Sequence, residues 1–277
     1  MARIDLSGKP IAITGASSGI GAATAIECAR AGMPVVLGAR RVDKLEAVAN
    51  IITAAGGRAA TVAMDVTKPD DCRRLIDETV ARFGSVYAVF ANAGYGLEAP
   101  IAEMTDEAMR QIFETNFYGT LNTIAPALPR MLEARSGHIL ICSSCLAKMT
   151  LPYYGAYSAT KAAQNHIGRA MNLELRHKGV HVSTVHPIGT RTEFFNTVQK
   201  LNGGIKIVEH TPDRFMQPPE RVARAIVRCL RRPRPEVWTS RFVRLGMAFC
   251  NAFPGVEDRW IRWMLERRRR NLGLPED

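Results

Sequence analysis

The chain has 277 residues, of which 47% are hydrophobic and 23% charged, so it can bury a sizeable core and wholesale disorder is excluded. Its formal net charge of +11 favours anionic partners: a phosphorylated cofactor, nucleic acid or an acidic membrane surface. The six cysteines are scattered, as in a reduced cytoplasmic protein, and we expect no signal peptide before the first apolar run at 10–14. No apolar stretch reaches the roughly 18 residues of a membrane-spanning helix.

Short apolar runs alternate with longer amphipathic stretches along the chain. The predicted strands are 11–14, 35–38, 59–64, 86–91, 138–142, 180–186 and 237–238, and the predicted helices are 20–31, 44–55, 69–83, 106–135, 157–178 and 219–231. The strands are rich in Val, Ile and Ala without strict alternation, which is typical of strands that helices cover on both faces. This order predicts an α/β fold, a doubly wound parallel sheet of the Rossmann type in a single domain at 1–235.

The first predicted strand leads into a glycine-rich loop, TGASSGIG, and then into a helix. Its three glycines permit a tight turn, leave room for a pyrophosphate and let the helix pack on the sheet. The amino terminus of that helix then directs unpaired N–H groups at the phosphates. The alternatives are an ordinary glycine-rich turn and a Walker loop, which requires a Gly-Lys-Ser/Thr sequence that is absent here. The predicted dinucleotide ligands in this loop are Gly15, Ser17, Ser18, Gly19, Ile20 and Gly21.

The residues after the second predicted strand favour NADP over NAD. An NAD enzyme usually has an acidic residue there, which binds the ribose 2′-hydroxyl and repels a 2′-phosphate. Ala39 removes that repulsion, while Arg40 and Arg41 offer positive charge beside Ser17, although either arginine alone is typical of a solvated helix start. Residues after the third and fourth strands are expected to line the adenine and ribose region, although each alone is more often a turn residue. These are Asp65, Val66, Asn92, Ala93 and Gly94.

Tyr157 and Lys161 are four residues apart in a predicted helix, so both side chains project from one face. A free tyrosine has a pKa near 10, and a nearby ammonium together with an oxidised nicotinamide would lower it. Tyr157 could then donate a proton to a carbonyl oxygen or take one from an alcohol. Ser144 follows the fifth strand, where its hydroxyl could hold the substrate oxygen, with Ser143 as the competing choice. Asn116 could bend its long helix and bind a water leading toward Lys161, or simply be a solvated or capping asparagine.

As a set, these residues resemble the short-chain dehydrogenase/reductase family over roughly residues 8–235. The resemblance is carried by the loop at 14–21 and then by Asp65, Asn92, Ala93, Gly94, Asn116, Ser144, Tyr157 and Lys161. It implies hydride transfer between a nicotinamide and a carbonyl or alcohol carbon. It assigns Tyr157 as the acid/base and Ser144 as the substrate-orienting residue, which the family's serine-to-tyrosine interval selects over Ser143. It also assigns Lys161 to binding the ribose and tuning the pKa of the tyrosine, and Asn116 to supporting a proton relay.

The chain departs from the family pattern after the sixth predicted strand. The family usually reads Pro-Gly-x-x-x-Thr, whereas the segment at 187–192 reads PIGTRT. Ile188 replaces the glycine, so we expect the backbone on the nicotinamide side to follow a different path. The cofactor contacts expected from this loop are Pro187, Gly189, Thr190 and Thr192.

Apolar side chains recur where the substrate is expected to enter, although several would serve equally as core or loop packing. They suggest an apolar carbonyl or alcohol substrate, such as a lipid, steroid or retinoid. Residues at about 190–216 are predicted to form a substrate lid that excludes water during hydride transfer. The apolar side chains are Tyr95, Leu97, Leu146, Met149, Leu151, Tyr153, Tyr154, Phe194, Phe195 and Phe215.

Residues 236–277 are predicted to form a basic, amphipathic extension. Trp260, Trp263 and Met264 fall on one helical face flanked by arginines, which suits an interfacial helix on an anionic membrane surface. A helix packed on its own domain or on a partner subunit explains the pattern equally well, and the family habit is dimers or tetramers. Nucleic acid is not expected as a partner, because no recognised module accompanies the arginines. We therefore expect a cytoplasmic homo-oligomer, with peripheral membrane association left open.

Other functions suggested by the sequence are disfavoured. The sequence CSSC at 142–145 matches a redox CxxC, but it contains the proposed catalytic serine, so only a modifiable Cys145 remains from this idea. No HExxH or paired CxxC occurs, so no metal site is expected. The rival functions are a catalytically idle NADP-binding sensor, a nucleic-acid-binding protein and an S-adenosylmethionine transferase; Ala39 counts against the last, which would need an acidic ribose ligand. The predicted function is an NADP(H)-dependent oxidoreductase.

Overall fold

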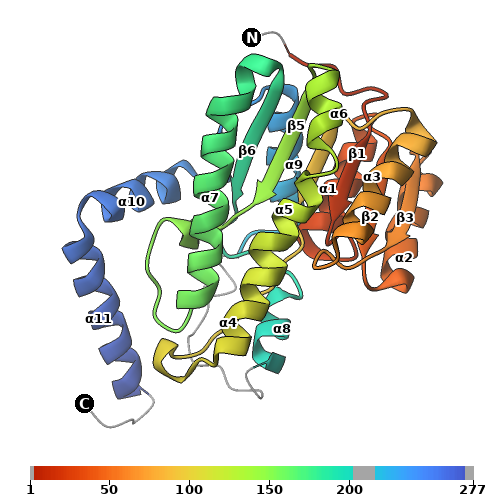
Figure 1. The fold of residues 1–277 in the computed structure, drawn as a ribbon. Coiled ribbons are helices and arrows are strands. Elements are labelled where there is room, and N and C mark those ends of the chain that lie inside the picture. The colour runs from red at the N-terminus through yellow and green to blue at the C-terminus, as the bar shows by residue number, and fades with distance from the viewer. Residues whose placement is uncertain (1–2, 202–215, 272–277) are drawn as a thin grey trace.

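Seven parallel strands form the centre of the protein in a computed structural model that describes residues 3–201 and 216–271 (Figure 1). Their order across the sheet is β3-β2-β1-β4-β5-β6-β7. The strands are β1 (Ile11–Thr14), β2 (Val35–Ala39), β3 (Ala59–Ala63), β4 (Ala88–Ala91), β5 (Gly137–Cys142), β6 (Val180–His186) and β7 (Glu236–Trp238). The order reverses between β1 and β4, so the loops that follow these two strands diverge and leave a crevice at this edge of the sheet.

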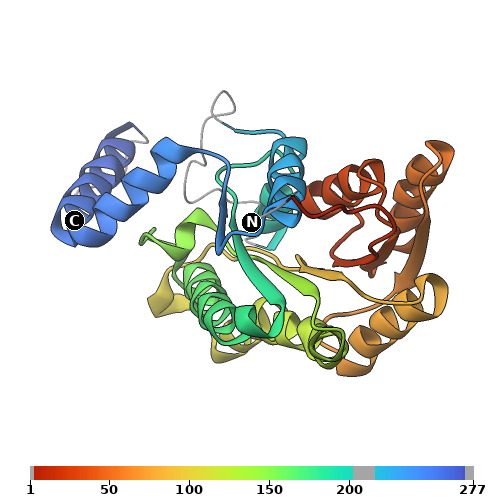
Figure 2. The same cartoon turned by 90° about the horizontal axis from the view of Figure 1, so that it is seen from above.

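Helices cover both faces of the sheet, which explains why its strands are apolar on both sides (Figure 2). One core lies between the sheet and the helices α1 (Gly19–Arg30), α2 (Val42–Ala54) and α9 (Pro219–Arg231). The second core lies between the sheet and the helices α3 (Pro69–Phe83), α5 (Gly119–Ile124) and α7 (Gly155–Leu175). Every residue of β1, β4 and β5 is buried. The predicted doubly wound α/β fold in a single domain is confirmed.

The helix predicted over 106–135 is wrong as one continuous element. It consists of α4 (Asp106–Phe113), a π-helical segment (Glu114–Tyr118), α5 and α6 (Leu128–Glu133). In the π segment the carbonyl of Asn116 accepts hydrogen bonds from the side chains of Thr120 (2.8 Å) and Gln164 (2.6 Å), which satisfy it locally. Between α5 and α6, Pro126 has no N–H to continue the helical ladder.

The remaining predicted elements occur with small shifts of their ends. The strand predicted over 86–91 begins at Ala88, and α7 begins at Gly155, two residues before Tyr157. α7 ends at Leu175, and a 3-10 turn (Arg176–Lys178) follows it. Short 3-10 turns also occur at Ile101–Glu103 and Cys145–Ala147, and the helix α8 (Phe194–Leu201) follows β6.

The C-terminal segment is built into the fold at its beginning and extends away from it at its end. β7 pairs with β6, so the sheet continues past the predicted limit at residue 235. The helices α10 (Arg241–Ala252) and α11 (Pro254–Asn271) then form an arm beside the sheet, which we call the C-terminal arm (Figures 1 and 2). The Glu257 carboxylate on α11 accepts a hydrogen bond from the Thr150 N–H (2.7 Å). Within the described segments, no helix is long and apolar enough to cross a membrane.

Candidate active site

A cavity of about 830 Å³ opens at the C-terminal ends of the strands, where the strand order reverses. Nearly all of the predicted site residues line this cavity. Gly21 and Asn116 do not line it, and they act from behind its wall. The predicted residues that line it are Gly15, Ser17, Ser18, Gly19, Ile20, Arg40, Arg41, Asp65, Val66, Asn92, Ala93, Gly94, Ser144, Tyr157, Lys161, Pro187, Gly189, Thr190 and Thr192.

The glycine-rich loop after β1 has the shape that a dinucleotide phosphate requires. Gly15 and Gly19 adopt positive φ values of 65° and 57°, which residues with a Cβ rarely adopt. A Cβ on Gly21 would overlap the carbonyl oxygen of Gly15, so only glycine lets α1 pack against the loop here. The first turn of α1 carries no acidic side chain, and its amino-terminal N–H groups can therefore bind an anion. The loop fits the phosphates of a nicotinamide dinucleotide.

Asn92 fastens the loop to the sheet. Its side-chain amide donates to the carbonyls of Thr14 (3.1 Å) and Gly15 (3.3 Å), and its backbone N–H donates to the Thr14 hydroxyl (3.1 Å). The side chain predicted as a lining residue therefore also positions the phosphate loop. The Asp65 carboxylate accepts hydrogen bonds from the backbone and hydroxyl of Thr67 and lies 3.9 Å from the Arg40 guanidinium.

The basic residues after β2 separate into two environments. Arg40 is largely exposed, with 81% of its side chain accessible. Arg41 is directed at the phosphate loop, where one guanidinium nitrogen donates to the hydroxyls of Ser17 (3.1 Å) and Ser18 (2.7 Å). Arg41 and Ser17, two of the side chains predicted to hold a ribose 2′-phosphate, therefore lie together.

Tyr157, Lys161 and Ser144 line the cavity together, and all three are buried. The Lys161 ammonium donates to the carbonyl of Cys142 at the end of β5 (2.8 Å) and lies 5.5 Å from the centre of the Tyr157 ring. Ser144 follows β5 and accepts a hydrogen bond from the Leu146 N–H (3.1 Å). The Ser143 hydroxyl instead donates to the Lys161 carbonyl (2.8 Å), away from Tyr157. The choice of Ser144 over Ser143 remains a prediction, and the position of both hydroxyls is compatible with it.

Burial has the largest effect on the protonation of this site, and the expectation that Lys161 and an oxidised nicotinamide lower the pKa of Tyr157 remains a prediction for the cofactor-bound protein. In the protein alone, burial raises the pKa of the Tyr157 phenol, although a hydrogen bond with Ser144 acts the other way. Burial also lowers the pKa of Lys161 from 10.5 to about 8. The sequence argument considered the charges of Lys161 and of an oxidised nicotinamide, and it omitted the loss of water around the phenol, which is the larger effect in the protein alone.

Asn116 holds the site from behind rather than lining it. Its side-chain amide donates to the Tyr95 carbonyl (2.9 Å) and the Thr160 hydroxyl (3.1 Å), and its amide oxygen accepts from the Tyr95 N–H (2.9 Å). These bonds connect the π segment, the strand-end loop after β4 and α7, and so fix the helix that carries Tyr157. The expected water relay from Asn116 to Lys161 remains a prediction.

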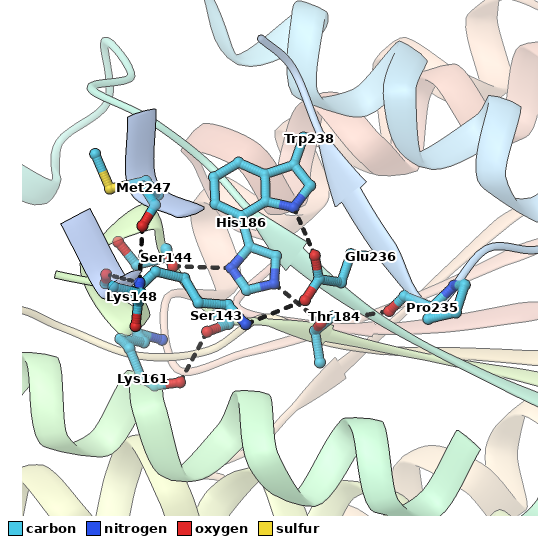
Figure 3. A network of polar contacts seen from close by, with 11 residues as sticks. Ser143, Ser144, Lys148, Lys161, Thr184, His186, Pro235, Glu236, Trp238 and Met247 are labelled. Carbon is cyan, nitrogen blue, oxygen red and sulfur yellow. Dashed lines mark hydrogen bonds and ion pairs between the residues drawn. The ribbon is translucent and has the colours of Figure 1, made fainter. Parts of the chain in front are cut away.

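A buried histidine at the end of β6, which the sequence analysis did not single out, supports Ser144 (Figure 3). Nδ1 of His186 lies 2.9 Å from the Ser144 carbonyl, and Nε2 lies 3.0 Å from the Thr184 hydroxyl. Since a carbonyl only accepts, Nδ1 carries a proton and donates to Ser144, and in a neutral imidazole Nε2 is then the acceptor. Burial lowers the pKa of His186 to about 4, which keeps it neutral. Its ring stacks on Trp238 of β7, with centroids 4.5 Å apart.

The same network reaches the C-terminal arm (Figure 3). The Glu236 carboxylate accepts from the Trp238 indole N–H (2.9 Å) and pairs with the Lys148 ammonium (3.1 Å). The carbonyl of Lys148 accepts a hydrogen bond from the Asn251 side chain on α10, which also donates to the Met247 carbonyl (2.8 Å). The loop that carries Ser144 is therefore held by β6, β7 and α10.

The loop at 187–192 is hydrogen-bonded to Gln217, just before α9. Ile188, the departure from the family pattern, lines the cavity. The Gln217 N–H donates to the Gly189 carbonyl, and the Arg191 N–H donates to the Gln217 carbonyl, both at 2.9 Å. The greater part of the predicted lid at 190–216, namely 202–215 with Phe215, lies outside the described residues.

Apolar side chains form the substrate side of the cavity. Leu97 and Tyr153, which were expected there, do not line the cavity, although they pack in the same apolar cluster as residues that do. Trp260 and Met264 of α11 also line the cavity. The sequence analysis placed both residues on one helical face but did not predict that this face lines the cavity. The predicted apolar residues that line it are Tyr95, Leu146, Met149, Leu151, Tyr154, Phe194 and Phe195.

The CxxC sequence shows no sign of a reactive thiol pair. Cys142 and Cys145 are free cysteines, and burial raises the pKa of both thiols. Because the thiolate is the reactive form, neither cysteine is activated in this environment.

The Rossmann-type sheet, the phosphate loop and the buried Ser-Tyr-Lys group define a nicotinamide-dependent oxidoreductase. The sequence model of the short chain dehydrogenases matches residues 9–202. This chain therefore belongs to the short-chain dehydrogenase/reductase family.

Relatives and solved structures agree with this assignment. An uncharacterized oxidoreductase of Listeria innocua, Lin0452, is 36% identical over 218 residues, which cover 76% of this chain and 88% of the relative. The alcohol dehydrogenase of the archaeon Thermococcus sibiricus, solved with 5-hydroxy-NADP, is 31% identical with a TM-score of 0.69, covering 80% of this chain and 89% of that one. A 7α-hydroxysteroid dehydrogenase, solved with NADH and 7-oxo glycochenodeoxycholic acid, is 28% identical with a TM-score of 0.73. The match covers 82% of this chain and 88% of that one.

Proposed function

We propose that this chain is an NADP(H)-dependent oxidoreductase that interconverts an apolar ketone or aldehyde with its alcohol, a compound of the lipid, steroid or retinoid kind. The observation that carries the proposal is that Ser144, Tyr157 and Lys161 lie buried together in a cavity that many apolar side chains also line. A carbonyl group held at Ser144 and Tyr157 would then leave the rest of the substrate against Leu146, Phe194 and the other apolar side chains.

The protonation of the site favours the reductive direction. Burial raises the pKa of Tyr157, so the phenol holds the proton that a carbonyl oxygen must receive, and the nearby charge of Lys161 must offset the weaker acidity of the buried phenol when that proton is donated. The Ser144 hydroxyl holds that oxygen beside the phenol, and the Lys161 ammonium, fixed by the Cys142 carbonyl, stabilises the negative charge that develops as the proton leaves. The nicotinamide, when bound, supplies the hydride to the carbonyl carbon. Asn116 keeps α7 in position for this transfer.

The preference for NADP rests on Arg41 together with Ser17 and Ser18. A guanidinium and two hydroxyls at the end of β2 can hold a ribose 2′-phosphate, whereas Ala39 offers no carboxylate to bind a 2′-hydroxyl. Of the two solved neighbours described above, one holds an NADP derivative and the other NADH. The preference for NADP in this chain is therefore argued from its own residues.

An apolar substrate is supported by the composition of the chamber. The cavity that holds Tyr157 is also lined by Met149 and Leu151 of the loop after β5, by Phe195 of α8, and by Trp260 and Met264 of α11. A large apolar molecule that enters this space would release water from these side chains, which favours binding. The 7-oxo bile acid in the 7α-hydroxysteroid dehydrogenase is a molecule of this kind.

The test is NADPH oxidation with a panel of aldehydes and ketones of increasing hydrophobicity, run beside the same panel with NADH. Tyr157→Phe removes only the phenolic hydroxyl and is expected to lower kcat at least about a hundredfold. NADPH binding, measured by fluorescence titration, should stay within about threefold. Tyr118→Phe, at a half-exposed tyrosine outside the cavity, is the matched control and should keep full activity. Turnover that survives in Tyr157→Phe contradicts the proposed chemistry.

For the C-terminal arm we propose peripheral binding to an anionic membrane surface. α10 has no buried residue, and it exposes Phe242, Leu245 and Phe249 beside the exposed Arg241 and Arg244. Apolar side chains flanked by arginines are the pattern of an interfacial helix on anionic lipid.

The membrane proposal is tested with vesicles that contain anionic lipid. The triple variant Phe242→Ser, Leu245→Ser, Phe249→Ser should lose co-sedimentation, whereas Leu173→Ser, at an exposed position on α7, should keep it. Equal sedimentation of the triple variant and the wild type contradicts the proposal. Light scattering of the same variants shows whether this face instead joins the subunits of a homo-oligomer, the dimer or tetramer expected from the family.

A further inference from the structure

A glutamate from the opposite side of the cavity reaches the basic residues that follow β2. Oε2 of Glu193 lies 2.7 Å from an Arg41 guanidinium nitrogen, and Oε1 is bonded to the Lys44 ammonium. Glu193 comes directly after the loop that follows β6, whereas Arg41 and Lys44 lie at the start of α2, about 150 residues earlier in the sequence. These two cations lower the pKa of Glu193 to about 2, so the carboxylate is ionised at neutral pH.

The position of this carboxylate coincides with the subsite that would hold a ribose 2′-phosphate. The Arg41 guanidinium that contacts Glu193 also donates to Ser17 and Ser18 of the phosphate loop. A 2′-phosphate held by Arg41 would therefore come close to the Glu193 carboxylate, and two anions in contact repel each other. Glu193 and the phosphate would compete for the same two cations.

We propose that Glu193 is a specificity-determining residue that narrows the preference for NADP over NAD. When the ribose carries a 2′-hydroxyl, the carboxylate stays on Arg41 and Lys44 and takes the place of the missing phosphate. When the ribose carries a 2′-phosphate, Glu193 must give up these cations before the phosphate can bind them. This inference rests on the proposed function, which places the 2′-phosphate at Arg41.

The expected effect is moderate, because the ion pairs are partly exposed. About 45% of the Arg41 side chain and 44% of the Glu193 side chain are accessible to solvent, so water screens their attraction. If Glu193 occupied the cations in nine of ten molecules, the apparent affinity for the phosphorylated ribose would fall about tenfold. We therefore expect removal of the carboxylate to strengthen NADPH binding by about threefold to tenfold.

The experiment measures binding without turnover, by titration calorimetry on the full chain. The ligands are NADPH, NADH, adenosine 2′-monophosphate and adenosine 5′-monophosphate, and the proteins are the wild type, Glu193→Gln and Glu46→Gln. Glu46 is an exposed carboxylate on α2 that does not line the cavity, so its removal changes the net charge by the same amount without touching the subsite. Glu193→Gln should increase the affinity for NADPH and adenosine 2′-monophosphate by about threefold to tenfold. It should leave the affinity for NADH and adenosine 5′-monophosphate unchanged or lower it.

A change of less than twofold in the NADPH-to-NADH ratio, or an equal change in Glu46→Gln, overturns the proposal. So does a uniform weakening of all four ligands, because it would show that Glu193 only holds the loop in place. In an Arg41→Ala background, Glu193→Gln should have little further effect on the ratio, as expected for residues that act on one group.

The same series separates a failure of this inference from a failure of the proposed cofactor. If the wild type binds NADPH no better than NADH and Arg41→Ala changes neither affinity, the preference for NADP is wrong and the role of Glu193 is refuted with it. If Arg41→Ala weakens NADPH selectively but Glu193→Gln leaves the ratio unchanged, only the role of Glu193 is refuted.

Discussion

Replacing Lys161 with methionine is expected to stabilise the folded protein while abolishing its activity. The Lys161 side chain is only 4% exposed, and burial lowers its pKa from 10.5 to about 8. A pKa difference of this size corresponds to about 3 kcal/mol, and the buried ammonium lowers the unfolding free energy of the wild type at pH 7 by this amount. Methionine has a similar shape and no charge, but it loses the hydrogen bond to the Cys142 carbonyl, which is worth about 1 kcal/mol. The variant should therefore be more stable by about 2 kcal/mol.

The pH dependence of this gain identifies its cause. The unfolded chain binds the Lys161 proton more tightly than the folded chain, so the cost to the wild type decreases as the pH rises from about 8 toward 10.5. The advantage of Lys161→Met should shrink by about 1 kcal/mol between pH 7 and pH 9. In the same variant, NADPH-linked reduction should fall at least about a hundredfold.

Urea unfolding without cofactor, followed by circular dichroism at pH 7 and pH 9, measures both quantities. Lys178→Met, at an exposed lysine after α7, is the matched control and should change the stability by less than about 0.5 kcal/mol. A Lys161→Met protein that is less stable than the wild type at pH 7, or a difference that is the same at both pH values, would refute the argument.

Three further predictions concern the loop, the histidine network and the reaction. Gly21→Ala should destabilise the protein by about 2 kcal/mol and weaken NADPH binding, because its Cβ overlaps the Gly15 carbonyl; Gly246→Ala on α10, with nothing within 4 Å of the new Cβ, should instead be neutral or stabilising. Since the pKa of His186 is lowered to about 4, its contribution to stability is present above pH 6.5 and is lost as the pH falls toward 4. The unfolding free energy of the wild type relative to that of His186→Gln, measured by thermal or urea melts, should therefore be about 2 kcal/mol lower at pH 5 than at pH 7. The reductive kcat/KM should decrease above a pKa near 8 as Lys161 loses its proton, and a profile that stays flat to pH 9.5 would exclude this role for its charge.

The sheet and the residues directly after its strands were predictable, because both follow from local patterns. Apolar runs of four to seven residues separated by amphipathic helices define a parallel sheet, and the C-terminal ends of such strands meet at one edge. Gly15, Arg41, Ser144 and Tyr157 therefore line one cavity, as the order of the motifs along the chain indicated.

The parts that were not predicted depend on contacts between distant segments. The π segment around Asn116 needs Gln164 of α7 to satisfy its freed carbonyl, and the neutral state of His186 needs β7 and the Ser144 loop around it. The pairing of Glu193 with Arg41 joins two loops on either side of the cavity. The raised pKa of Tyr157 follows from burial, which a spacing of four residues to Lys161 does not reveal.

The two C-terminal side chains in the reaction chamber, Trp260 and Met264, come from beyond the segment 9–202 that matches the family. The phosphate loop and the proposed catalytic residues Ser144, Tyr157 and Lys161 lie within that segment, whereas part of the cavity lining comes after it. The apolar lining of the cavity is thus encoded in two stretches of the chain, most of it within 9–202 and a smaller part in α11. Exchanging the terminal helices between relatives would therefore change the substrate selectivity while the proposed catalytic residues stay the same.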